Sequence, residues 1–125
     1  MKELSLRQQR VGSEVRTQLA RILPSALEWD PILKEASLTV LVVRMSSDLR
    51  LATVTLGRQS MTDSLAEKKI LLRLKERVPQ IRKQLARAVQ LRFVPDVRFR
   101  FEAKDDETLS ILLQQIRAEN GMDSD

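Results

Sequence analysis

The sequence predicts a single α+β domain, and three observations support this prediction. Apolar residues recur at steps of three and four in residues 5–27 and on both sides of Pro79, which is typical of amphipathic helices. Three short segments rich in β-branched or alternating apolar residues are typical of strands. The chain has 125 residues, of which 42% are hydrophobic, so it can bury a core. We expect residues 1–118 to form the domain and residues 119–125 to be a short, acidic, frayed tail.

The first helix is predicted over residues 5–27. Ser5 and Gln8 have the spacing of a capping box, in which two side chains bind the amides at a helix start. Gly12 lies inside this helix at a cost of about 1 kcal/mol, so it is either simply tolerated or marks a close approach to another backbone. Pro24 either kinks the last turn or ends the helix early.

A β-hairpin is predicted after a turn or linker at residues 29–31, where the residue before a proline is disfavoured in helical geometry. Residues 37–45 and 50–56 are rich in Val, Leu and Thr, which is typical of strands. Between them, residues 46–48 supply the small polar side chains of a turn. We expect Gly57 to end the second strand.

The second half of the chain is predicted to hold two helices, a strand and a short helix. A second capping box at Ser64 begins a helix to about residue 77, and Pro79 suits the first turn of a helix ending near residue 91. Residues 97–101 alternate between apolar side chains and arginine, as a half-buried strand does. Acidic residues begin a short helix within residues 105–118.

The composition excludes several kinds of active site. Cysteine, histidine and tyrosine are absent, which rules out disulfides, thiolate or imidazole metal sites, and Cys–His or Ser–His pairs. Asp48, Asp63 and residues 105–107 could hold Mg²⁺, but a turn or a helix start explains each of them better. We therefore expect no enzyme activity, no cofactor and no metal. No signal peptide or apolar stretch of membrane-spanning length is apparent, so we expect a cytoplasmic protein without membrane contact.

Positive charge is concentrated in the second half of the chain. The net charge is +5, but residues 65–104 hold twelve Lys and Arg against four Asp and Glu, and residues 105–125 hold one against six. Lys69, Arg73 and Arg77 are spaced to form one ridge on a helix, and ridges meeting at a helix break are typical of a phosphate-binding surface. The primary candidate RNA contacts are Lys69, Arg73, Lys75, Arg77, Arg82, Lys83 and Arg87. The secondary candidates are Arg10, Arg92, Arg98 and Arg100.

One residue of this set has two alternative roles. Arg82 lies at the edge of an apolar stripe, so its role is either binding or structural.

The aromatic residues indicate how RNA would be recognised. The chain has only four of them, and we expect Phe99 and Phe101 in the core and Trp29 as a packing anchor. Recognition of RNA bases on an exposed aromatic surface is therefore disfavoured, and contact with the RNA backbone is favoured.

Five segments, in this order and spacing, resemble the bacterial ribosome-binding factor A family over about residues 5–118. They are Arg10-Val11, Asp30-Pro31-Ile32-Leu33, Ser47 to Val54, Ile81 to Leu85 and Leu91 to Phe99. The resemblance implies a KH-like domain of type II topology (α-β-β-α-kink-α-β) followed by a short C-terminal helix. In place of the family's interhelical Ala-x-Gly kink, this chain has Glu76-Arg77-Val78-Pro79-Gln80, in which proline supplies a kink by a different route.

The same resemblance implies a function in ribosome assembly. Family members bind the small (30S) subunit and its 16S rRNA, promote late maturation including processing of the 16S rRNA 5′ end without cleaving RNA, and support growth in the cold. It implies no cofactor, and we expect a monomer that contacts 16S rRNA and, as further partners, ribosomal proteins. The alternative is a protein-interaction module whose basic face is only solvated surface.

Overall fold

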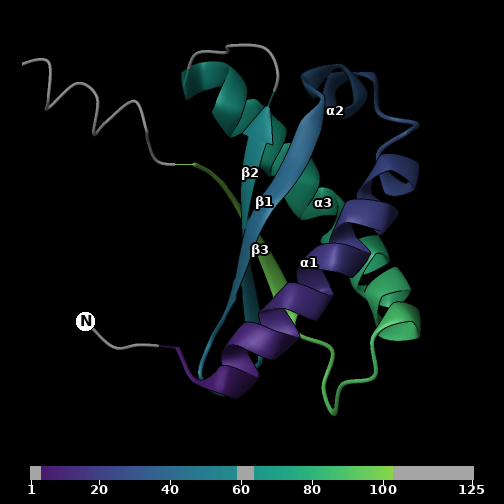
Figure 1. Ribbon diagram of the computed structural model, residues 1–125. Helices are drawn as coiled ribbons and strands as arrows, with labels where there is room; N and C mark the ends of the chain where they lie inside the picture. The colour runs from purple at the N-terminus through teal and green to yellow at the C-terminus, as the bar shows by residue number, and fades with distance from the viewer. Residues whose placement is uncertain (1–3, 59–63, 103–125) are drawn as a thin grey trace, which may run out of the picture.

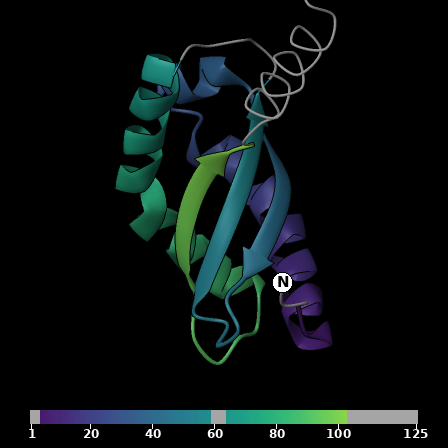
Figure 2. The ribbon, with the colours of Figure 1, turned by 90° about the vertical axis from the view of Figure 1, so that its left-hand side faces the viewer.

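The computed structural model describes residues 4–58 and 64–102, which form two layers (Figure 1). The elements are α1 (Leu6–Ala26), α2 (Pro31–Ala36), β1 (Leu38–Met45), β2 (Leu51–Arg58), α3 (Ser64–Ala88) and β3 (Asp96–Phe101). The strands form one sheet of order β1-β2-β3, in which β1 pairs antiparallel with β2 and β3 pairs parallel with β2. The helices all lie on one face of this sheet, as Figures 1 and 2 show from two directions.

Helix α1 begins as predicted and lies very close to β1. Ser5 Oγ accepts a hydrogen bond from the Gln8 amide at 3.1 Å, and the Ser5 amide donates to Gln8 Oε1 at 2.8 Å, so the capping box is confirmed. Pro24 does not end the helix early, because α1 continues to Ala26. A Cβ atom on Gly12 would lie 2.8 Å from the carbonyl oxygen of Val43, so this glycine marks a close approach of two backbones.

The turn expected at residues 29–31 is present only as far as Trp29, because a six-residue helix, α2, which was not predicted, begins at Pro31. Asp30 is its N-cap, and the carboxylate accepts hydrogen bonds from the amides of Ile32 at 3.1 Å and Leu33 at 3.3 Å. Pro31 occupies the first turn, where a missing amide hydrogen costs nothing. Ser37 ends the helix in the left-handed region, with φ of 51°.

The hairpin of β1 and β2 is confirmed, although β2 continues through Gly57 to Arg58. Asp48 fixes the turn between the strands, because its Oδ1 accepts from Ser46 Oγ at 2.7 Å and from the Arg50 amide at 3.1 Å. The hydrogen bond from Ser46, followed by that from the Arg50 amide, lowers the pKa of the Asp48 carboxyl. Leu49 has a φ of 62°, a conformation rare for a bulky residue that this turn imposes.

The two helices predicted around Pro79 are one continuous helix, α3, which ends at Ala88 rather than near residue 91. Pro79 lies inside α3, and the helix changes direction near its middle, where the colour passes from teal to green (Figure 2). Of the two alternatives expected here, a break or a kink, the structure has the kink. Proline kinks a helix because it lacks an amide hydrogen and its ring crowds the preceding turn.

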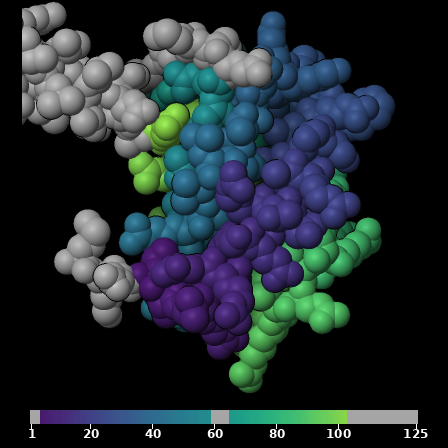
Figure 3. Space-filling view, viewed as in Figure 1, coloured from purple at the N-terminus to yellow at the C-terminus, as the bar shows by residue number. Residues whose placement is uncertain are grey.

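The core lies between the helices and the covered face of the sheet. Its fully buried side chains include Leu19 of α1, Leu33 of α2, Leu56 of β2 and Leu74 of α3. Figure 3 shows α1 in purple lying against the green C-terminal part of α3, and these two helices are in contact. The predicted helix within 105–118, the tail at 119–125 and Asp63 lie outside the described residues. In the part of the chain described, no helix is both long and apolar enough to cross a membrane.

Candidate nucleic-acid interface

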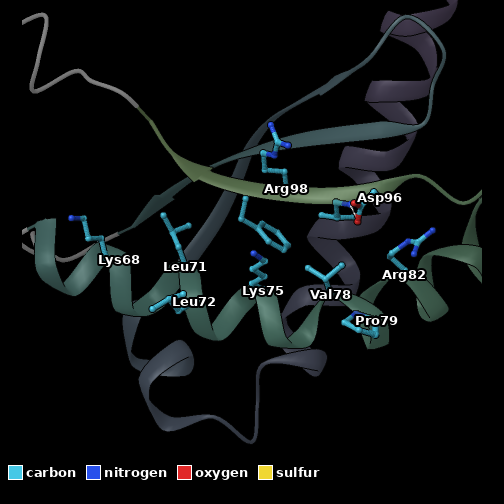
Figure 4. A pocket seen from close by; sticks show the side chains of 11 residues that line it. Lys68, Leu71, Leu72, Lys75, Val78, Pro79, Arg82, Asp96 and Arg98 are labelled. Carbon is cyan, nitrogen blue, oxygen red and sulfur yellow. Dashed lines mark hydrogen bonds between the residues drawn. The ribbon is translucent and has the colours of Figure 1, made fainter.

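A groove of about 830 Å³ separates α3 from β3, the edge strand of the sheet (Figure 4). Its floor is apolar and comes from both elements, with Leu71 and Val78 on α3 and Val97 and Phe99 on β3. Val97 is buried and Phe99 is half-buried because alternate residues of β3 face α3. An edge strand beside a kinked helix thus leaves an open channel between them.

Basic side chains surround this apolar floor. Lys68 and Lys75 are exposed and line the groove from α3, and Figure 4 shows Lys75 extending from α3 toward β3. Arg98 is exposed and points away from α3, on the outer side of β3. The lining holds one carboxylate, Asp96, whose Oδ1 accepts from the Val97 amide at 2.9 Å. A strand of nucleic acid fits such a site, with phosphates at the cations and bases or sugars over the apolar floor.

Arg82 lines the same groove, but its guanidinium group holds the backbone that leads into β3. Its Nε donates to the carbonyl of Pro95 at 3.0 Å and its Nη2 donates to the carbonyl of Val94 at 2.9 Å. The planar guanidinium suits this pair of acceptors, because its donors are fixed in a fork. Of the two roles considered for Arg82, the structural one matches the geometry.

The ridge of Lys69, Arg73 and Arg77 was expected to bind phosphate, yet two of its members contact a carboxylate of the protein itself. Arg73 Nε lies 3.1 Å from Asp30 Oδ1 and 2.8 Å from Oδ2, and Arg77 Nη2 lies 3.8 Å from Oδ2. Asp30 is only 3% exposed. This cluster therefore attaches α2 to α3 on a side of α3 other than the groove, while Lys69 is exposed.

The ionisation of Asp30 depends on this cluster. Burial disfavours the carboxylate and by itself raises the pKa, but the opposing effects are larger in sum. These are the hydrogen bond from Arg73, the amides of Leu33 and Ile32, and the positive charge of Arg73. The pKa of Asp30 is thereby held below its usual value, and the carboxylate stays charged at neutral pH.

The remaining sequence candidates lie at different distances from the groove. Lys83 and Arg87 are exposed on the half of α3 that follows Pro79, and Lys83 lines a shallow hollow next to the groove's end. Arg100 is exposed on β3 beyond the groove lining, and Arg10 lies in a separate hollow along α1. Arg92 lies over the ring of Phe93, with Cζ 5.5 Å from the ring centroid. The structure thus brings together Lys75, Arg82 and Arg98, with Lys83 beside them.

Sequence reasoning missed Lys68 as a groove residue. The signal was present, since Lys68, Lys75 and Arg82 follow one another at intervals of seven residues and so share one side of a helix. Helical ridges at intervals of four drew attention to Lys69, Arg73 and Arg77 instead. The four-residue interval finds neighbours on a helix, but it does not say which side faces β3.

The sequence is similar to one family model and to individual proteins of the same family. The family model of ribosome-binding factor A matches residues 7–112. A ribosome-binding factor A from Rhodopseudomonas palustris is 42% identical over 103 residues, covering 82% of this chain and 73% of that protein. One from Methylobacterium radiotolerans is 38% identical over 125 residues, covering 96% of this chain and 84% of its own length.

Solved structures agree with the fold. The crystal structure of ribosome-binding factor A from Thermus thermophilus superposes with a TM-score of 0.62 and 28% identity, covering 74% of this chain and 93% of that one. The solution structure of a Thermotoga maritima protein gives a TM-score of 0.66 at 23% identity, covering 84% and 96%, and supports the fold alone. The fold is KH-like, as in these structures, and this confirms the fold class expected from the sequence.

Proposed function

The chain belongs to the ribosome-binding factor A family, and on that premise we propose that it binds the small (30S) ribosomal subunit through 16S rRNA. In this proposal it promotes late maturation of the subunit, including processing of the 16S rRNA 5′ end. It acts by binding alone, as a cytoplasmic monomer without a cofactor, and another protein cleaves the RNA. Its role supports growth in the cold, and ribosomal proteins are its further neighbours.

The observation that carries the proposal is the groove between α3 and β3. Its lining combines an apolar floor with four cationic side chains and one carboxylate, which suits a polyanion that also offers apolar surface. Lys68, Lys75 and Arg98 contact phosphates in this proposal, and Lys83 and Arg87 extend the contact beyond Pro79. Arg73 and Arg77, which bind Asp30, hold α2 against α3 in this proposal. Arg82 holds the start of β3 against α3, so all three arginines support the interface.

Salt dependence tests this mechanism directly. Five cations that each neutralise one phosphate give a slope of about −3 to −5 when the logarithm of affinity is plotted against that of salt concentration. Affinity for purified 30S subunits is measured between 50 and 200 mM KCl by fluorescence anisotropy of the labelled protein. Lys34→Ala, an exposed cation on α2, serves as the control and keeps the slope. Affinity that does not change over this range would contradict phosphate binding.

A protein-interaction module is the second candidate, and exposed apolar side chains away from the groove favour it. Trp29 is 84% exposed, so the sequence expectation of a packing anchor is wrong, and Val42 of β1 is 54% exposed. Charge reversal of Lys83 and Arg87 to Glu separates the candidates. Loss of 30S association supports RNA binding, whereas undiminished association favours a protein partner, for which Trp29→Ala and Val42→Ser are then the decisive variants.

A further inference from the structure

A second pocket lies where the β1–β2 turn, the start of α1 and the segment before β3 meet. Its volume is about 260 Å³, and its lining includes Arg7, Asp48, Leu91, Arg92 and Phe93. None of these five residues lines the groove between α3 and β3. The pocket is therefore a separate feature of the surface.

Phe93 gives this pocket an exposed aromatic ring that two arginines approach. Phe93 is 48% exposed to solvent, whereas Phe101, the last residue of β3, is only 8% exposed. The Cζ atom of Arg50 lies 4.7 Å from the Phe93 centroid, and that of Arg92 lies 5.5 Å away. A guanidinium plane and an aromatic ring in contact form a surface on which RNA bases stack.

The turn that carries Arg50 is held in one conformation. Asp48 Oδ1 accepts from Ser46 Oγ and from the Arg50 amide itself, and Leu49 is fixed at a φ of 62°. Arg50 therefore leaves the backbone from a defined position beside Phe93. A preorganised stacking group loses little conformational entropy when a ligand binds.

Positive charge exceeds negative charge at this pocket, whose lining holds Arg7 and Arg92 and one carboxylate, that of Asp48. Among residues 4–58 and 64–102, no carboxylate lies within ion-pair distance of Arg7, Arg50 or Arg92. Arg7 lies in the first turn of α1, which holds no acidic residue and where the helix dipole disfavours a cation. The arrangement is unfavourable for the protein alone and becomes favourable when an anion binds.

We propose that the Phe93 pocket binds one unpaired nucleotide of an RNA strand. The base stacks on the surface formed by Phe93 and Arg50, and the neighbouring phosphates contact Arg7 and Arg92. This inference rests on the proposed RNA-binding function and adds to it a contact that distinguishes single strands from duplexes. The sequence disfavoured recognition of RNA bases on an exposed aromatic surface, and in this proposal Phe93 is the exception.

The test uses the full chain and two probes, a fluorescently labelled single-stranded RNA of ten nucleotides and a duplex of the same sequence. Phe93→Leu keeps an apolar side chain but removes the ring, so affinity for the single strand falls about 5- to 150-fold while the salt slope is unchanged. Arg92→Gln flattens the slope by about 0.7 because one phosphate contact is lost. Neither duplex affinity nor thermal unfolding changes in Phe93→Leu.

A second variant keeps the test decisive if Phe93→Leu unfolds. Arg50→Lys retains the charge but loses the planar group, so single-strand affinity falls while the salt slope stays the same. Wild-type affinity for the single strand in both variants would overturn the pocket proposal. Binding of 30S subunits is measured in parallel, so a protein that binds subunits but not the oligonucleotide refutes the pocket alone, and one that binds neither refutes the proposed function as well.

Discussion

Replacing Gly12 by alanine has two opposing effects on stability. Alanine has the higher helix propensity, but its Cβ atom would collide with the backbone of β1, and the balance decides whether the protein becomes more or less stable. Alanine is favoured over glycine inside a helix by about 1 kcal/mol, so propensity alone predicts a more stable protein. A Cβ atom at this position would lie 2.8 Å from the carbonyl oxygen of Val43, and contacts under 3.0 Å require something to move. The obstacle is backbone, which cannot rotate away as a side chain does.

Two side-chain hydrogen bonds oppose the shift of β1 away from α1 that alanine needs. Gln8 Nε2 donates to the carbonyl of Met45 at 3.0 Å, and Arg16 Nε donates to that of Leu41 at 2.8 Å, on either side of Val43. Forced overpacking costs about 1 to 3 kcal/mol. With the propensity gain of about 1 kcal/mol subtracted, we expect Gly12→Ala to lower the free energy of unfolding by about 1 kcal/mol.

Urea unfolding followed by circular dichroism measures this change, and a thermal midpoint about 4 °C lower accompanies it. Gly57→Ala is the matched control, because its Cβ would meet the Cδ1 methyl of Leu41 at 3.1 Å, the mobile end of a side chain. The control should stay within about 0.5 kcal/mol of the wild type, as substitutions without a rigid clash do. A Gly12→Ala protein more stable than the wild type by about 1 kcal/mol, the propensity value, would refute the close approach of α1 and β1.

Three further predictions concern charged residues. The double variant Lys68→Ala, Lys75→Ala should flatten the salt slope of 30S affinity by about 1.4 to 1.8 with unchanged unfolding, and an unchanged slope would remove both lysines from the interface. Arg82→Ala should lower the free energy of unfolding by about 1 to 3 kcal/mol in urea, because two backbone carbonyls lose a charged donor, and Arg82→Lys should not restore it. Because the pKa of Asp30 in the folded protein lies below its usual 3.8, its carboxylate stabilises the fold above about pH 4, and this contribution is lost as the pH falls through the lower, folded value. Urea midpoints measured from pH 7 to pH 2.5 should therefore fall less steeply in Asp30→Asn, with Asp48 supplying part of the dependence that remains.

Local chemistry made much of the fold predictable. The capping box at Ser5 depends on two residues three positions apart, and the hairpin depends on strand patterns flanking a turn. Alternation in β3 predicted which side chains face the helices, and Val97 and Phe101 are indeed buried. Each of these signals lies within a few residues of the structure it predicts.

The sequence predictions were wrong where the same residues are typical of two different local structures. An aspartate before a proline is typical of a turn, yet it is equally the N-cap and first-turn pair of a helix, and Asp30 and Pro31 begin α2 in this way. Pro79 was expected either to break the helix into two or to kink it. Buried side chains on both sides of it, Leu74 and Ile81, pack on the same core, so α3 continues through the kink.

The candidate site was less predictable because its geometry depends on contacts that are distant in sequence. Arg73 and Asp30 are 43 residues apart, so no spacing rule could show that this arginine contacts α2. Phe93 lies in the segment before β3 and acquires its arginine neighbour, Arg50, from the β1–β2 turn. Charge density along the chain located residues 65–104, which include α3 and β3, as the basic region, and the tertiary structure divided its cations between support and the groove.

Binding to the small ribosomal subunit is the central claim, and sedimentation of the tagged protein through a sucrose gradient tests it most directly. The wild-type protein should migrate with small subunits and be absent from translating ribosomes, and the Lys68→Ala, Lys75→Ala variant should shift toward the top of the gradient. A folded wild-type protein that remains at the top at low salt would contradict the claim.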